Sequence, residues 1–263
     1  MFKRINTLAV LPLLAAPLAA QQSPDEWLEK CRSRGGERHC EVREYTLSAP
    51  GNVLVLTASA NGGIHVRAAD RSDVRIVAKV EAHAQSRSAA RDLAGEVKVV
   101  LGSGEVRSEG PRISGNQGWS VSYDVWAPGG TSVRMRTVNG GLSTDGIAGD
   151  IDAESTNGGI DLSGVRGAVS AHTTNGGVTI AVAGGDLGGI GIAARTTNGG
   201  IVLAIPENLG AELTAKAVNG GVTVGFPVQV SGRIGRTLQA TLGSGGPPIQ
   251  LETANGGITI RRP

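Results

Sequence analysis

The 263-residue sequence is poor in the residue types that most catalytic and metal sites use. Only 3% of its residues are aromatic, two are cysteines, and four are histidines, at positions 39, 65, 83 and 172. No histidine lies at metal-ligand spacing from another. The glycine clusters are never followed by the Lys-Ser/Thr pair of a phosphate-binding loop, and no nucleophile elbow or zinc-protease helix is present. The sequence therefore has no recognisable catalytic motif, and we predict no cofactor.

Glycine is abundant, with 41 residues, and valine, isoleucine and threonine are plentiful. The glycines follow no collagen-like triplet, and β-branched residues favour extended strands. A chain of this length with 40% hydrophobic residues can bury a core in one or two domains. The composition therefore predicts an all-β fold of many short strands joined by turns.

Residues 1–20 have the layout of a secretory signal peptide. Lys3 and Arg4 precede an apolar run that ends in small residues, and we expect cleavage after Ala20. The run is short and interrupted by prolines, so an uncleaved anchor is the weaker alternative. No later segment reaches membrane-spanning length. We therefore expect an exported protein, periplasmic, on the outer surface or secreted, with no transmembrane segment after removal of the leader.

The net charge gives no reason to expect nucleic-acid binding. Removal of the leader takes two of the 25 basic residues and none of the 23 acidic residues, which leaves 23 of each sign. A neutral chain without a basic patch lacks the electrostatic attraction that such binding requires. We expect the partner to be a surface protein or a polysaccharide, and the sequence does not identify it.

Residues 21–44 are predicted to form an N-terminal segment with a helix and a disulfide. Ser23 is typical of an N-cap and begins the helix. Cys31 and Cys40 lie in CRSRGGERHC, and an exported chain meets oxidising conditions that favour a disulfide between them. The alternative is a metal site that combines both sulfurs with His39, but it lacks a fourth ligand at a recognisable spacing.

An Asn-Gly-Gly motif recurs through residues 45–263. Its asparagines lie at positions 61, 139, 157, 175, 198, 219 and 255, with intervals of 18 to 23 residues in the densest part. The third residue after each asparagine is apolar, and small hydroxylated residues commonly precede the motif. Alternation with period two on both sides indicates two strands joined by a Gly-Gly corner. The repeat therefore predicts one structural unit that stacks on itself.

The repeated asparagines are predicted structural corners of a single-domain, parallel β-helix-like β-solenoid over residues 45–263, of either hand. In coils about 4.8 Å apart, their amides would form a hydrogen-bonded ladder, and glycines with positive φ would make the turns. We expect Asn255 at the end of this ladder and Asn175 in its interior, so that replacement of Asn175 should be tolerated far worse. An antiparallel meander of Asn-Gly hairpins is the alternative. The predicted corners are Asn139, Asn157, Asn175, Asn198, Asn219 and Asn255.

A charged column is predicted on the outside of the solenoid, three residues before the asparagines. It comprises Arg136, Glu154, His172, Arg195, Lys216 and Glu252. Such a row could line a sugar groove, as in β-helix enzymes that act on polysaccharides, or it could pair opposite charges on neighbouring coils. The acidic residues around Asp150 lack the glycine-aspartate nonapeptide of calcium-binding repeats, and we interpret them as a solvated strand edge.

Several segments resemble a family of bacterial domains of unknown function that are described as candidate adhesins. They are the corners TVNGGLST, STNGGIDL, TTNGGVTI and TTNGGIVL, the lead-in YDVWAPGG and the closing LGSGGPPIQLETANGGITIRR. The resemblance covers most of residues 41–263 and leaves out the cysteine-containing segment. It implies a β-solenoid of the cell surface or envelope with no established activity and no catalytic residues to transfer.

The sequence therefore favours a non-enzymatic, exported β-solenoid that acts by surface contact, with an adhesin-like role in the envelope or at the cell surface. Two alternatives remain open. One is a carbohydrate-active β-helix enzyme, which turnover of acidic or neutral polysaccharides dependent on Glu154 or His172 would support. The other is a folded scaffold for envelope sensing, which genomic neighbours encoding sensors or regulators would support.

Overall fold

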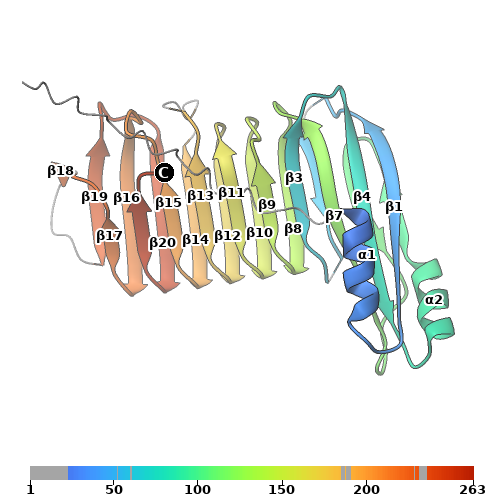
Figure 1. The fold of residues 1–263 in the computed structure, drawn as a ribbon. Coiled ribbons are helices and arrows are strands. Elements are labelled where there is room, and N and C mark those ends of the chain that lie inside the picture. The colour runs from blue at the N-terminus through green and yellow to red at the C-terminus, as the bar shows by residue number, and fades with distance from the viewer. Residues whose placement is uncertain are drawn as a thin grey trace, which may run out of the picture.

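The protein folds into two long β-sheets that face each other across one continuous apolar core (Figure 1). The computed structural model describes residues 23–51, 53–59, 61–184, 187, 191–227, 229–230 and 236–263. The predicted signal peptide at residues 1–20 lies outside the described residues. Strands dominate the described part, together with the helices α1 (Pro24–Ser33) and α2 (Arg87–Glu96). The predicted all-β fold class is confirmed.

We name the two sheets by their strand numbers. In spatial order, the ten-stranded sheet consists of β1 (Arg38–Ser48), β4 (Asp73–His83), β7 (Gly118–Pro128), β3 (Ile64–Ala69), β9 (Leu142–Asp145), β11 (Ile160–Val165), β13 (Val178–Val182), β15 (Ile201–Ala204), β21 (Ile258–Arg261) and β17 (Val222–Val224). The eleven-stranded sheet consists of β18 (Gln229–Val230), β19 (Thr237–Leu242), β16 (Ala211–Asn219), β20 (Pro248–Asn255), β14 (Ile192–Asn198), β12 (Val169–Asn175), β10 (Ile151–Asn157), β8 (Ser132–Asn139), β2 (Val53–Thr57), β6 (Glu105–Glu109) and β5 (Lys98–Leu101).

Each coil crosses from the eleven-stranded to the ten-stranded sheet at an Asn-Gly-Gly corner. In β10, Ile151 and Ala153 are buried and point into the core, whereas Asp152 and Glu154 point to the outer face. Neighbouring coils pair in parallel and in register, so that Ala153 lies opposite Ala171 of the next coil. This alternation buries one side of every strand. The predicted β-solenoid is confirmed, and the meander alternative is wrong for the stack.

Both ends of the stack change to antiparallel pairing, which the sequence analysis did not predict. At the N-terminal end, β1 pairs with β4 and β4 pairs with β7, before β7 returns to parallel pairing with β3. At the other end, β19 pairs antiparallel with both β16 and β18. Antiparallel strands need no crossover connection, so they suit the places where the regular coils stop.

The coils do not stack in sequence order. The coil of β20 and β21 is inserted between the coil of β14 and β15 and the coil of β16 and β17. Asn255 is therefore an interior member and Asn219 lies at the end, so the terminal position predicted for Asn255 is wrong. The inserted coil places Glu252 between Arg195 and Lys216. Sequence order would have set these two cations side by side, and like charges on neighbouring strands are destabilising.

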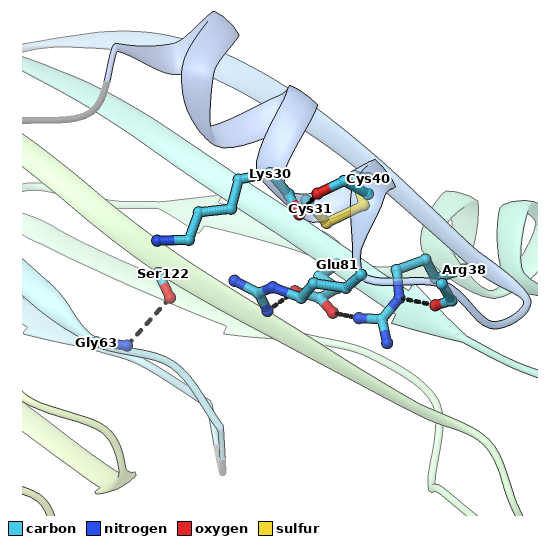
Figure 2. A network of polar contacts seen from close by, with 10 residues as sticks. Lys30, Cys31, Arg38, Cys40, Gly63, Glu81 and Ser122 are labelled. Carbon is cyan, nitrogen blue, oxygen red and sulfur yellow. Dashed lines mark hydrogen bonds and ion pairs between the residues drawn. A yellow bond between two sulfur atoms is a disulfide. The ribbon is translucent and has the colours of Figure 1, made fainter.

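The N-terminal segment is fixed to the ten-stranded sheet by the predicted Cys31–Cys40 disulfide, whose Cα atoms lie 6.3 Å apart (Figure 2). Both cysteines are buried. Ser23 caps α1, as predicted. Close to the bridge, Arg38 donates to the carboxylate of Glu81 on β4. The helix, the bridge and this ion pair together hold the segment against the strands.

The second helix, α2, lies against β1 and β4 at the N-terminal end of the molecule (Figure 1). Ser86 is its N-cap, and Leu93 and Ala94 join the core. Within the described ranges, neither helix has the length and apolar character needed to cross a membrane.

Candidate functional site

The asparagine row at the corners is the first polar surface that the sequence singled out. Each asparagine after Asn61 donates through Nδ2 to Oδ1 of the preceding asparagine in the stack, with N–O distances of 2.7–3.0 Å. All the predicted corner residues lie in this one ladder. Its order is Asn61, Asn139, Asn157, Asn175, Asn198, Asn255 and Asn219.

Hydroxyl groups form a second ladder just inside the first. They belong to residues two positions before an asparagine, and each donates to the carbonyl oxygen of the first corner glycine in the neighbouring coil, at 2.7–3.0 Å. These hydroxylated residues were not predicted to have a role, although the sequence shows their fixed offset from the glycine. The donors are Thr137, Ser155, Thr173, Thr196 and Thr253.

The first glycine of a corner is required because neighbouring coils approach closely there. A Cβ atom on Gly176 would lie 2.3 Å from the carbonyl oxygen of Gly158, and a Cβ atom on Gly158 would lie 1.9 Å from that of Gly140. Gly176 lies outside the positive-φ region, so the turn conformation predicted for these glycines is wrong there. The second glycine has more room, because a Cβ atom on Gly177 would lie 3.4 Å from the oxygen of Gly200.

The corner row is thus occupied by the hydrogen bonds of the stack itself. Interior amides use their oxygen and one N–H group in the ladder, and the glycine carbonyls accept from the buried hydroxyls. A ligand at this edge would meet few free polar groups. We therefore assign the row a structural role.

The charged column lies on the outer face of the eleven-stranded sheet, and most of its members pair with one another. Glu252 lies 3.7 Å from Arg195 and 3.6 Å from Lys216, and Arg136 lies 3.0 Å from Glu154. Exposed pairs of this kind contribute about 0–1 kcal/mol each. The column is therefore largely self-neutralised. In stacking order it reads Arg136, Glu154, His172, Arg195, Glu252 and Lys216.

Asp152, next to this column on β10, is held ionised by two arginines. Its Oδ2 atom accepts from Arg136 Nη2 at 2.7 Å and from Arg134 Nε at 3.0 Å. Burial acts to raise the pKa of Asp152, but the hydrogen bonds and positive charges of Arg136 and Arg134 outweigh burial and hold it below its usual value. A general acid for glycoside cleavage needs a raised pKa, so Asp152 is unsuited to that role.

A groove of about 540 Å³ crosses the beginnings of these strands on the same face. Small side chains lie in its middle, over β12 and β14, while charged and amide side chains from the flanking coils lie at its two ends. None of the described residues that line it is aromatic. The small residues are Ala168, Ser170, Gly191 and Ala193, and the flanking residues are Arg134, Asp150, Asp152, Pro248 and Gln250.

The outer face of the ten-stranded sheet carries a different cluster near its N-terminal end. Trp126 of β7 lies between two arginines, with the guanidinium carbons of Arg67 and Arg75 at 5.4 and 5.0 Å from its ring centroid. Each cation–π contact of this kind stabilises by about 0.5–1 kcal/mol at an exposed site. The strands β3 and β4 place the two arginines on either side of β7.

His65 belongs to the same cluster. Arg67 donates to its Nδ1 atom at 3.2 Å, and the ion pair of Lys79 and Asp124 lies alongside, with a 2.5 Å N–O distance. Burial lowers the pKa of His65, and the positive charge of Arg67 lowers it further. His65 is therefore neutral at neutral pH and accepts a hydrogen bond. Nowhere in the described part of the chain do three or more His, Cys, Asp or Glu residues form a group that could hold a metal ion.

The repeat region of the chain is similar to known proteins. Solved structures with similar folds include a candidate cell adhesion protein from Clostridium sporogenes (12% identity, 86% of this chain and 100% of that chain covered, TM-score 0.49) and a candidate adhesin from Bacteroides fragilis (13%, 86% and 97%, TM-score 0.40). No curated protein matches. The model of the Toastrack DUF4097 family matches residues 55–261, and the chain belongs to this family.

Proposed function

We propose that the protein is an exported, non-enzymatic β-solenoid that acts by surface contact and binds an extended polysaccharide across the eleven-stranded sheet. The observation that carries this proposal is the groove, in which small side chains on two coils are flanked by charged and amide groups on their neighbours. Neighbouring strands lie about 4.8 Å apart, so an extended polymer laid across them would meet an equivalent position on each coil. The adhesin-like resemblance of the repeat supports the same role.

The polar groups around the groove suit a ligand rich in hydroxyl groups. Arg134 donates hydrogen bonds, Asp150 and Asp152 accept them, and Gln250 does both. Asp150 is held in place because it accepts from the backbone N–H group of Ala168 at 3.0 Å. Sugar hydroxyls donate and accept, so they can use every one of these groups, whereas large apolar side chains of a protein ligand would find few contacts.

Binding without cleavage is favoured over a carbohydrate-active enzyme. Asp152 is held ionised by two arginines, and Glu154 lies 3.0 Å from Arg136. Glycoside hydrolysis uses one carboxyl group that is protonated and one that is not. His172 lies between Glu154 and Arg195 and has no ion-pair partner among the described residues of the column. Any hydrolytic activity should therefore be tested first in a variant of His172.

Affinity electrophoresis through gels that contain polygalacturonate, xylan or dextran tests the proposal. We expect at least one polysaccharide to retard the parent protein and Ala193→Trp, which fills the groove, to abolish the retardation. The matched control is Ala181→Trp, on the outer face of the ten-stranded sheet, which should behave like the parent. A parent that no polysaccharide retards, or equal losses in both variants, would contradict the proposal. Release of reducing ends that disappears in Glu154→Gln or His172→Gln would establish the enzyme instead.

A further inference from the structure

The edge strands of the two sheets differ in length, and one is unlike the others. The eleven-stranded sheet ends in β18 and β5, of two and four residues, and the ten-stranded sheet ends in β17, of three residues, and β1, of eleven. Short edge strands limit pairing with other chains, whereas a long edge is a template for a further strand. Among the described strands, β1 is therefore the edge best suited to strand addition.

The free side of β1 carries a regular row of backbone groups. The N–H group of Ala84 donates to the carbonyl oxygen of Glu37 at 3.0 Å, which fixes the hydrogen-bonding phase of the antiparallel β1–β4 pair. Odd-numbered residues of β1 direct their N–H and C=O groups toward β4. Even-numbered residues, from Arg38 to Ser48, direct theirs away from the sheet, where no described strand pairs with them.

The two halves of this edge differ in accessibility. Near Arg38, both helices lie against β1, and Cys40 is buried beside its disulfide partner. In the second half, the side chains of Glu44, Thr46 and Ser48 are exposed. A strand can therefore approach the second half without displacing either helix.

The second half also borders an opening into the core. Tyr45 and Leu47 of β1, and Val99 and Leu101 of β5, are only partly buried and pack against the core from the ends of the two sheets. A hollow of about 810 Å³ lies between Leu47 and Leu101. An added strand whose alternate residues are apolar would cover these side chains.

We propose that β1 docks a second copy of this chain, with residues 44–48 of the two copies paired antiparallel about a two-fold axis at Thr46. In this register the free backbone groups of even-numbered residues meet their counterparts. Tyr45 of each copy lies opposite Leu47 of the other on the core side, so the strand supplies its own apolar complement. Such a self-complementary contact is the usual form of a two-fold interface.

Side-chain pairing disfavours two of the other registers that keep the backbone phase. A two-fold axis at Arg43 or at Glu44 would place like charges directly opposite each other, which is destabilising. With the axis at Thr46, Glu44 faces Ser48 and Thr46 faces Thr46, a pairing that favours strand association. The charges of β1 therefore support this register.

Sedimentation equilibrium over a range of protein concentrations tests the dimer. We expect a reversible dimer of the parent and a dissociation constant at least about tenfold higher for Thr46→Lys, because the introduced charges meet across the axis. Thr179→Lys is the matched control, since it makes the same change on the outer face of β13 inside the sheet, and it should leave the dissociation constant unchanged. Both threonines are at the surface, so the variants should fold.

Oxidative cross-linking tests the register independently. Directly paired Cα atoms lie about 5.5 Å apart in a hydrogen-bonded antiparallel pair, within the range of a disulfide. Thr46→Cys should therefore form a covalent dimer on oxidation, and Thr179→Cys should not. A parent that stays monomeric at several hundred micromolar, or a dimer that Thr46→Lys does not weaken, would overturn the proposal.

Discussion

The coil stack and the N-terminal end of the molecule are stabilised in different ways. In the stack, three contacts recur from corner to corner. They are a hydrogen bond between asparagine side chains, a hydrogen bond from a hydroxyl group to a glycine carbonyl oxygen, and a close backbone contact at the first glycine. At the N-terminal end each contact occurs once, as in the disulfide and in the bond from Arg43 to the carbonyl oxygen of Ala94 in α2. Because the stack repeats the same contacts, the free energy of unfolding lost with one contact depends on its position in the stack. At the N-terminal end, the loss depends only on the contact that is removed.

The largest effect should come from the first corner glycine. Gly176→Ala should lower the free energy of unfolding by about 3 kcal/mol or more, because its Cβ atom would overlap a backbone oxygen of the next coil. Gly177→Ala should cost about 1 kcal/mol or less, because its Cβ contact at 3.4 Å is only tight. Urea denaturation measures both. Similar losses in the two variants would show that close approach is not the reason for the glycine.

Removal of the disulfide tests how the N-terminal end of the molecule is stabilised. Replacing Cys31 and Cys40 by serine should destabilise by about 2–3 kcal/mol on the chain-entropy model for so short a loop. The loss should be local, because the described contacts of α1 are mainly with β1 and β4 at the N-terminal end. Hydrogen exchange should therefore accelerate in α1 and β1 and stay at the parent rate in β12. Faster exchange in β12 as well would mean that the stack depends on the N-terminal segment.

The hydroxyl ladder lacks a donor in the coil of β16. Thr173→Val should cost about 1–3 kcal/mol, because the carbonyl oxygen of Gly158 loses the donor that the fully buried Thr173 side chain supplies. In the coil of β16 the equivalent residue is Ala217, which cannot donate. Ala217→Ser should therefore stabilise by about 0.5–1 kcal/mol through a bond to Gly256. Thermal unfolding of both variants checks the signs, and destabilisation by the serine would contradict the assigned role.

The asparagine ladder should show a smaller effect that depends on position. Asn175→Ala and Asn255→Ala each remove two hydrogen bonds, whereas Asn219→Ala removes one. These side chains are exposed, so each bond contributes about 0.5–1.5 kcal/mol and the interior variants should lose roughly twice as much as the end variant. Urea midpoints measure the difference. An Asn255 variant that behaves like the Asn219 variant would contradict the stacking order.

The smallest effect concerns His65 and pH. Because its pKa is lowered in the folded state, the unfolded chain binds more protons once the pH falls below the usual histidine value of 6.5. The parent should therefore lose stability as the pH falls from 7 to 5, and His65→Gln should reduce this slope. Urea midpoints at several pH values test it, and identical slopes in the two proteins would count against burial as the cause.

The features that could be predicted from sequence each depend on a particular residue type at a fixed spacing along the chain. The corners, the two-strand coil, Ser23 as a helix cap and the Cys31–Cys40 pair all have this character. The positive φ predicted for the corner glycines is found at Gly62 and Gly256 but not at Gly176. A small residue can be required either for its backbone conformation or for close approach, and only the structure distinguishes the two. At Gly176, close approach is the reason.

Features that depend on which coils are neighbours could not be predicted. β16 and β20 carry similar inward residues, Leu213 opposite Ile249 and Ala215 opposite Leu251, so either strand fits beside β14. The groove was missed because its small residues and its flanking residues come from different coils, and it exists only once those coils are adjacent. The antiparallel ends were missed because period-two alternation is the same for both strand directions.

The inserted coil also constrains how the chain can fold during synthesis. Residues 211–224 leave the ribosome before residues 248–261, yet the earlier segment reaches the stack only through the later one. Coils up to β15 can add to the growing end as they emerge, whereas the coil of β16 and β17 reaches its final neighbours only after residues 248–261 have been made. Intermediates that expose apolar surface are prone to aggregation. Completion of the stack therefore requires residues 248–261 to take a place between two segments that are synthesised earlier.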